Sequence, residues 1–282
     1  MPDETHPTAL FDRRAWRLHR ARARRAGTVD FLRHEVNDRL LDRLEVVNRA
    51  FPVALDLGAA DLSLTRLLAQ RPGTARVVAA EPAPLTGARP DIAADPEFLP
   101  FCDAGFDLIA SSLALHWAGD LPGALVQLRR ILKPDGLLLA ALFGGQTLVE
   151  LRTVLFEAEL AEEGGVSPRV SPTIELSDAA ALLQRAGFAM PVADGETITV
   201  TYPDLLALLR DLRGMGETNA LAARRRGFLR RATLARAAAI YAERFAMPDG
   251  RIPATFEVVF LTGWAPHPDH AKPRPRPRRR IG

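Results

Sequence analysis

The hydrophobic positions in the first half of the chain follow two alternating patterns. Stretches with apolar residues at every third or fourth position are typical of amphipathic helices. They alternate with short runs that are apolar throughout, which are typical of buried strands. Strands that are apolar on both faces indicate a parallel sheet covered by helices on each side. The predicted helices are 31–47, 62–71 and 121–136, and the predicted strands are 52–57, 75–81, 105–115 and 137–144.

The pattern changes after Gly145, where helices are interrupted by two late strands. Ser177 precedes an apolar helical run, so it is the predicted N-cap of that helix. The predicted elements are helices over 147–163 and 177–188, a strand over 196–203, helical segments over 203–246 and a strand over 254–264. Together, the two halves predict a doubly wound α/β sheet whose last strand is antiparallel.

Composition divides the chain into three parts. We expect residues 1–50 to form a basic N-terminal arm and helix, 51–265 one α/β domain, and 266–282 a disordered Pro- and Arg-rich tail. Within the central domain, two insertions at about 144–172 and 203–250 predict helical lids over the end of the sheet.

The arginine-rich segment 11–27 has only part of the character of a mitochondrial presequence, because such peptides are poor in acids and this segment contains Asp12. We expect it to belong to the mature chain as a solvated helix, with Trp16 and Leu18 as its contact residues. A basic arm that binds a membrane surface or a partner is the alternative.

The sequence pI of about 9.6 reflects positive charge at the ends of the chain. From Pro266 onward, six lysines and arginines stand against Asp269 alone. By difference from the overall charge of +3, the rest of the chain carries −2. A nearly neutral body lacks a broad phosphate-binding face, so we expect no nucleic-acid partner. Cys102 is the only cysteine, which excludes an intrachain disulfide and a thiolate zinc cluster. No apolar run approaches the length of a membrane span.

Polar groups gather where the predicted strands end. Asp56 and Gly58 follow the first strand, and Glu81 ends the second. Ligands of open α/β sheets bind beyond the carboxyl ends of the strands, where a carboxylate can accept from both hydroxyls of a ribose. Asp95 offers an acceptor for an adenine amino group, and Pro96 begins an apolar wall. Acids without a Walker-type phosphate cradle favour a cationic, phosphate-free nucleoside, which S-adenosylmethionine is. The neighbouring residues included in this predicted cofactor site are Ala59, Pro82 and Ser112.

Several short motifs carry a family resemblance. Those of the first half are LDLG, DPEFLPF, FDLIASSLALHW, DLPGAL and LKPDG. In this order they resemble the motifs of class I S-adenosylmethionine-dependent methyltransferases. The later stretches FGGQTLVELR, EEGGVSPRVSP, YPDLLALLRDLRGMGETNA and PATFEVVFLTGW are similar to a family of respiratory complex I assembly factors with this fold. That resemblance runs from about Phe11 to Trp264, and the malonyl-carrier methyltransferase of biotin synthesis is similar over the first half and in the lid.

The resemblance implies a seven-stranded Rossmann-like methyltransferase sheet with S-adenosylmethionine as cofactor. The mitochondrial member of the assembly factor family hydroxylates an arginine. The resemblance therefore implies an enzyme that modifies an arginine of the quinone-site iron–sulfur subunit of complex I (NADH:ubiquinone oxidoreductase). Two alternatives stay open: methyl transfer to a carboxyl group or to a protein nitrogen or oxygen, and a non-catalytic assembly protein. We expect a bacterial cytoplasmic protein in peripheral association with the inner face of the respiratory membrane, with the mitochondrial matrix as the location of eukaryotic relatives.

The loop after the first strand departs from the family pattern Gly-x-Gly-x-Gly. This chain has Gly58, Ala60 and Leu62 at those places. If residue 60 has positive φ, alanine there costs on the order of 1 kcal/mol, and its methyl group crowds the methionine part of the cofactor. Because Glu81 and Asp95 are intact, we expect the cofactor to bind, with a degenerate, empty pocket as the alternative.

His116 is the candidate catalytic residue, because it lies just beyond a predicted strand and histidine titrates near neutrality, as a general base does. The structural alternative is a histidine at a helix start that packs against Trp117. The tail motif HPDH offers His267, Asp269 and His270 as part of an iron-binding triad, but a tail without a packed scaffold does not hold ligand geometry. No other cluster of histidines and carboxylates has metal-ligand spacing in the sequence, so we predict no metal.

Overall fold

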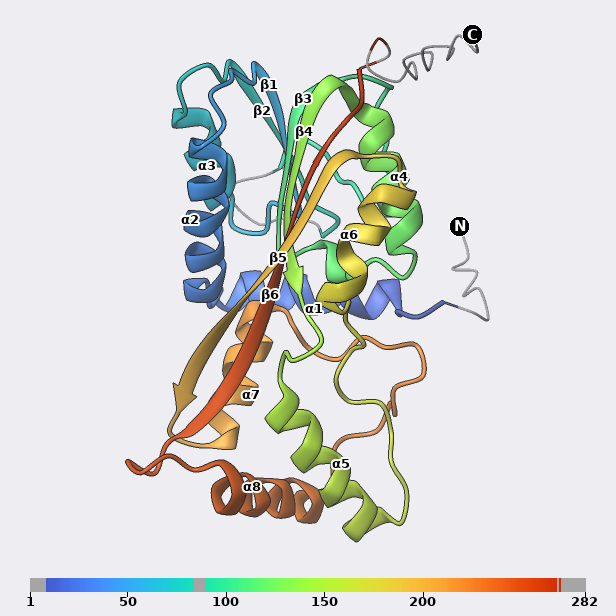
Figure 1. Ribbon diagram of the computed structural model, residues 1–282. Helices are drawn as coiled ribbons and strands as arrows, with labels where there is room; N and C mark the ends of the chain where they lie inside the picture. The colour runs from blue at the N-terminus through green and yellow to red at the C-terminus, as the bar shows by residue number, and fades with distance from the viewer. Residues whose placement is uncertain (1–8, 84–89, 268, 270–282) are drawn as a thin grey trace, which may run out of the picture.

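The computed structural model describes residues 9–83, 90–267 and 269, and its strands form one mixed sheet with helices on both faces (Figure 1). The strand order is β2-β1-β3-β4-β6-β5. β1 to β4 run parallel, and β6 is antiparallel to both of its neighbours. The strands are β1 Val53–Leu57, β2 Arg76–Ala80, β3 Phe106–Ser112, β4 Leu132–Phe143, β5 Ala189–Tyr202 and β6 Ile252–Trp264.

Two hydrophobic cores hold the helices to the sheet. One lies between the sheet and α2 and α3 and continues among α5, α7 and α8, and the other lies between the sheet and α4 and α6. This is the doubly wound arrangement that the hydrophobic pattern predicted. No helix in the described ranges is long and apolar enough to cross a membrane. The helices are α1 Arg13–Ala26, α2 Phe31–Glu45, α3 Ser63–Gln70, the short 3-10 helix η1 Leu115–Trp117, α4 Leu121–Ile131, α5 Val149–Glu163, α6 Leu176–Arg185, α7 Leu205–Met215 and α8 Arg231–Phe245.

The predicted antiparallel last strand is confirmed, but the described residues form six strands rather than seven. Beyond β2, Ile92 makes a single parallel bridge to Ala80 at the edge where a further strand would pair. The carboxylate of Asp91 accepts from the Ala79 N–H at 2.8 Å and so takes a donor that another strand would use. Residues 84–89, which precede this bridge, lie outside the described part of the chain.

Two predicted helix boundaries are wrong. α6 begins at Leu176 with Glu175 as its N-cap, so Ser177 lies inside the helix. α4 ends before Pro134, because Leu132 already pairs with β3 and the chain from that residue onward belongs to β4. In both cases the local signal was correct to within a few residues. For α4, pairing with β3 set the boundary.

The N-terminal helix α1 is not the solvated helix that the sequence favoured. It lies across the carboxyl ends of the parallel strands (Figure 1). Trp16 is 1% exposed, whereas Leu18 remains 45% exposed. Trp16 packs against Trp117 with the ring centroids 5.9 Å apart, inside a small core that also contains Phe11 and Leu221. α1 is therefore part of the end of the domain at which ligands of such sheets are expected.

Gly58 marks the point where β1 turns into the following loop. Its φ is +88°, in a region that L-residues rarely adopt, and a Cβ built there would lie 2.2 Å from the Cβ of Ala114. Gly250 has a similar φ of +80°, but a Cβ there would meet no atom within 4 Å. A substitution at Gly250 would therefore cause backbone strain alone, whereas one at Gly58 would cause both strain and crowding.

We predict that Gly250→Ala lowers the free energy of unfolding by about 1 kcal/mol, through backbone strain alone. Gly58→Ala should lower it by roughly 2–4 kcal/mol, because crowding against Ala114 adds to the strain. Urea unfolding followed by circular dichroism measures both variants. Equal losses would contradict the crowding.

Candidate functional site

The predicted cofactor residues come together at the carboxyl ends of three parallel strands. Asp56 is the penultimate residue of β1, Glu81 follows β2, and Ser112 ends β3. Their exposed fractions are 1%, 0% and 2%. Neighbouring parallel strands end on the same side of a sheet, which is why sequence reasoning could place these groups together. The remaining predicted cofactor residues lie in the loops that follow the strands, and they are Gly58, Ala59, Pro82, Asp95 and Pro96.

Glu81 is paired with Arg20 of α1. Arg20 Nε donates to Glu81 Oε1 at 2.8 Å and Nη2 donates to Oε2 at 2.7 Å, so one guanidinium spans both carboxylate oxygens. Glu81 is fully buried and Arg20 is 3% exposed. Burial alone would lower the pKa of Arg20, but the charge and hydrogen bonds of Glu81 outweigh it, and the pKa is raised above its usual value. Each of the two oxygens that would accept from a ribose diol is therefore bonded to Arg20, and the carboxylate has no exposed surface.

Asp95 is paired in the same way with Arg13 of α1. Arg13 Nε donates to Asp95 Oδ2 at 3.1 Å, and its Nη2 donates to Oδ1. Arg17, one helical turn further along, lies 3.5 Å from Oδ2. Both oxygens of the predicted adenine acceptor thus bind arginines of the N-terminal helix.

The loop after β1 differs from the expectation built on its glycine pattern. Ala60 does not have positive φ, and the left-handed residue is instead Leu62, with φ 60° and ψ 14°. The missing glycine therefore places strain on the order of 1–2 kcal/mol on Leu62. Arg24 of α1 donates to the carbonyl of Ala60 and lies 3.4 Å from that of Ala59.

S-adenosylmethionine, the cofactor that this fold implies, does not fit the site in this conformation. Glu81 and Asp95, which would hold its ribose and adenine, are each bonded to an arginine of α1. The loop that would face its methionine part is bonded to Arg24. The Ser112 carbonyl accepts from Arg33 of α2. Arginines of the chain itself thus occupy the predicted contact points of the ligand.

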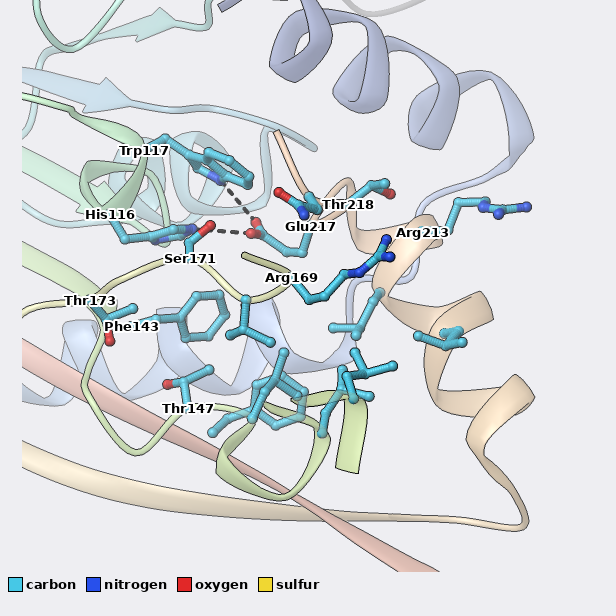
Figure 2. A pocket seen from close by; sticks show the side chains of 18 of the residues that line it. His116, Trp117, Phe143, Thr147, Arg169, Ser171, Thr173, Arg213, Glu217 and Thr218 are labelled. Atoms are coloured by element: carbon cyan, nitrogen blue, oxygen red, sulfur yellow. Dashed lines mark hydrogen bonds and ion pairs between the residues drawn. The ribbon is translucent and has the colours of Figure 1, made fainter. Parts of the chain in front are cut away.

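A separate cavity of about 260 Å³ lies between the end of the sheet and the lid helices (Figure 2). Its walls come from η1 and β4 on one side and from α5, α7 and two loops of the lid insertions on the other. Most of this wall is apolar. The apolar side chains that line it include Trp117, Phe143, Leu148, Leu151, Leu155 and Leu212.

Glu217 is the acid among the residues that line this cavity. His116 Nε2 lies 3.2 Å from Glu217 Oε2, and Trp117 Nε1 donates to Oε1 at 3.3 Å (Figure 2). Burial alone would raise the pKa of Glu217, but His116 and the nearby charge of Arg20 outweigh it, and the pKa is lowered. Glu217 is therefore an anion whose side chain is only 12% exposed.

His116, the predicted catalytic residue, is buried beside this carboxylate. Its ring lies 4.7 Å from that of Phe143 and 5.6 Å from that of Trp117, measured between centroids. Its Nδ1 is buried without a hydrogen-bond partner among the described residues. His116 thus packs against Trp117, as the structural alternative expected, and also lines the cavity, as the catalytic prediction requires. Its role as a base stays a prediction.

Sequence reasoning missed two groups that define this region. Glu217 follows Gly216 in a segment assigned to the lid, and a single acid beside glycines gives no periodic signal. The row of arginines on α1 does give a signal, because Arg13, Arg17 and Arg20 follow each other at helical spacing on one face. From the sequence alone, a charged helix face of this kind indicates a solvated helix, because the carboxylates that pair with it are distant in the chain.

Within the described residues, Asp30, His34 and Asp61 bring metal-ligand atoms within 4.8 Å of one another. His34 Nε2 lies 3.0 Å from Asp61 Oδ2, and Asp61 Oδ1 accepts from the Ser63 N–H at 3.1 Å and from its hydroxyl at 2.8 Å. These bonds account for the cluster without an ion, and we assign no metal to it. Of the tail motif HPDH, His270 lies outside the described residues.

The sheet, with acids beyond β1 and β2, has the architecture of class I methyltransferases. A methyltransferase domain family matches residues 55–140. The solved structure of the YcgJ protein from Bacillus subtilis gives a TM-score of 0.52 at 16% identity, over 81% of this chain and 98% of that one. A candidate methyltransferase from Bacillus halodurans gives 0.55 at 16% identity, over 82% and 99%. These likenesses show that the chain has the fold of the class I methyltransferases.

Curated relatives define the family more narrowly. The mitochondrial arginine-hydroxylase NDUFAF5 of Danio rerio is 43% identical over 259 residues, which cover 89% of this chain and 80% of that protein. The Homo sapiens protein of the same name is 42% identical over 277 residues, or 95% and 80%. A malonyl-[acyl-carrier protein] O-methyltransferase of Halorhodospira halophila is 40% identical over 255 residues, or 86% and 84%. The chain belongs to the arginine-hydroxylase NDUFAF5 family, which confirms the resemblance carried by its motifs.

Asp56 is the predicted cofactor residue whose ionisation the fold affects most. Its carboxylate is buried and accepts from the Thr65 hydroxyl at 2.6 Å. Burial raises the pKa of Asp56 from 3.8 to about 7, and Thr65 and Arg33 offset this only in part. Between about pH 4 and pH 7 the folded protein holds a proton that the unfolded chain has released, so this group lowers the stability as the pH rises.

We predict that Asp56→Asn, which removes the charge but keeps the shape, raises the free energy of unfolding at about pH 8 by on the order of 4 kcal/mol. Near pH 4 the variant and the wild type should be about equally stable, because Asp56 is then protonated in the folded state and half protonated in the unfolded chain. Guanidinium unfolding across this range measures the difference. Asp38→Asn, at an exposed site on α2, is the matched control. A difference that does not grow with pH would contradict the assignment.

Proposed function

We propose that this protein hydroxylates an arginine side chain of a protein partner during assembly of respiratory complex I. Membership of the arginine-hydroxylase family supports the reaction. The observation that carries it for this chain is the largely buried carboxylate of Glu217 in a cavity whose walls are mostly apolar. An arginine has the matching parts, because its stem is apolar and its planar cation binds a carboxylate through paired hydrogen bonds.

Glu217 is the carboxylate that a cation entering the cavity would meet, although the charge of Arg20 already lies close enough to lower its pKa. Two arginines of the described chain also line the cavity, but neither is hydrogen-bonded to this carboxylate. Arg169 is paired with Glu159. Arg213 is exposed and points away from Glu217 (Figure 2). The Glu217 end of the cavity is therefore the part suited to an incoming guanidinium.

His116 lies where a proton acceptor beside that guanidinium is needed. Its Nε2 already shares the Glu217 carboxylate, and histidine exchanges protons near neutral pH. Hydroxylation takes molecular oxygen and a two-electron donor as co-substrates, with one oxygen atom entering the arginine and the other leaving as water. We assign the chain's own residues only the binding and orientation of the arginine and the transfer of a proton at His116.

The proposal includes S-adenosylmethionine as the cofactor and the quinone-site iron–sulfur subunit of complex I as the partner that carries the arginine. Both follow from the family, and acids at the ends of β1 and β2 support the cofactor. We place the protein in the bacterial cytoplasm, in peripheral contact with the inner face of the respiratory membrane.

We predict that a strain lacking this protein loses a peptide of the iron–sulfur subunit whose mass exceeds that of the unmodified peptide by one oxygen atom. Wild-type protein restores the modified peptide. Glu217→Gln should lower the modified fraction at least about tenfold, because the charged partner of the guanidinium is lost. Mass spectrometry of peptides from purified complex I measures this fraction.

Glu243→Gln, at an exposed site on α8, is the matched control and should restore the modification fully. Circular dichroism verifies that both variants are folded. Restoration by Glu217→Gln would remove this carboxylate from the proposal. A missing methylene in place of a missing oxygen would identify methyl transfer. Failed assembly with no mass difference would identify a non-catalytic assembly protein.

A further inference from the structure

One face of α1 presents a row of cations to the groups that hold the cofactor in this fold. The row occupies both predicted carboxylates, Glu81 and Asp95, and the loop carbonyl of Ala60. Arg22, by contrast, is exposed on another face of the helix. The row consists of Arg13, Arg17, Arg20 and Arg24, at successive intervals of one helical turn.

α1 is held by a small core of its own. The apolar residues that fix it pack with Trp117 and Leu221 in a cluster separate from the two cores of the sheet. Its start is tied to the lid by the Asp12 N–H, which donates to the Ala220 carbonyl at 2.8 Å. Departure of the helix from the cleft would therefore break this small core and its contacts with α7, but not the packing within the two main cores.

We propose that α1 is an internal competitor of S-adenosylmethionine, and that the cofactor enters only when α1 has left the cleft. The two ligands exclude each other because Glu81 has no exposed surface while Arg20 is paired with it, so a ribose diol can reach its oxygens only after Arg20 has left. Arg13 imposes the same exclusion at Asp95. This inference rests on the proposed cofactor but not on the proposed reaction.

Departure of α1 also affects the cavity that contains Glu217. His19 Nδ1 of α1 lies 3.1 Å from the Thr218 carbonyl. Arg224, on the same lid loop, donates to Asp12 Oδ2 at 2.8 Å. The helix therefore holds the loop that carries Glu217. Departure of α1 would loosen this loop, which forms one wall of the cavity. The two sites open together.

Calorimetric titration of the full-length protein with S-adenosylhomocysteine tests this competition. We predict that Arg20→Gln binds the ligand at least about tenfold more tightly than the wild type, because the closed state loses its contact with Glu81. Arg22→Gln, with the same change on the exposed face, should bind like the wild type. If circular dichroism shows that Arg20→Gln is unfolded, Arg13→Gln replaces it with the same expectation, since the Arg13 side chain is 20% exposed.

Equal dissociation constants for the wild type and both variants would overturn the proposal. Weaker binding by Arg20→Gln would also overturn it, because α1 would then help to hold the ligand. Absence of binding in every form leaves α1 nothing to compete with and overturns it as well. A modified arginine in complex I, found together with any of these outcomes, would leave the proposed reaction standing. Equal or weaker binding would then remove only the competition, and absence of binding would remove the proposed cofactor as well.

Discussion

The buried pair of Arg20 and Glu81 fixes the relation between the N-terminal helix and the sheet. Removing one partner of such a pair leaves an uncompensated buried charge, at a cost of about 3–5 kcal/mol. The pair joins the end of β2 to α1, and α1 in turn holds the loop that carries Glu217. Glu81 and the loop that carries Glu217 are therefore held by the same helix.

The buried carboxylates at this end of the sheet are of two kinds, those paired with an arginine of the chain and one that is not. Glu81 and Asp95 are neutralised by arginines from within the chain. Glu217 is an anion that, within the described residues, has no arginine hydrogen-bonded to it. The first two carboxylates are thus paired with the chain's own guanidinium groups, and Glu217 is the one proposed to receive an arginine of another protein. Both sites use a carboxylate that can pair with a guanidinium, and α1 contacts Glu81 as well as the loop that carries Glu217.

The sheet and the position of its polar edge could be predicted because they follow from local patterns, as parallel strands end on one side. The role of α1 could not be predicted, because the pattern of an arginine-rich helix is typical of a solvated one. Arg20 is buried because it pairs with Glu81, which is 61 residues away in the sequence. Glu217 and His116 are likewise 101 residues apart. The glycine pattern predicted backbone strain at Ala60, but the residue with positive φ in this loop is Leu62. The position of α1 and the partner of His116 therefore depend on contacts between residues far apart in the sequence.

Hydrogen exchange of the full-length protein, followed by mass spectrometry with and without saturating S-adenosylhomocysteine, tests most directly whether α1 and the cofactor exclude each other. We predict that the ligand makes the amides of α1 exchange faster and protects the loops that follow β1 and β2. Bound ligand with α1 exchange that is unchanged or slower would contradict the exclusion, because the helix would then remain in the cleft beside the ligand.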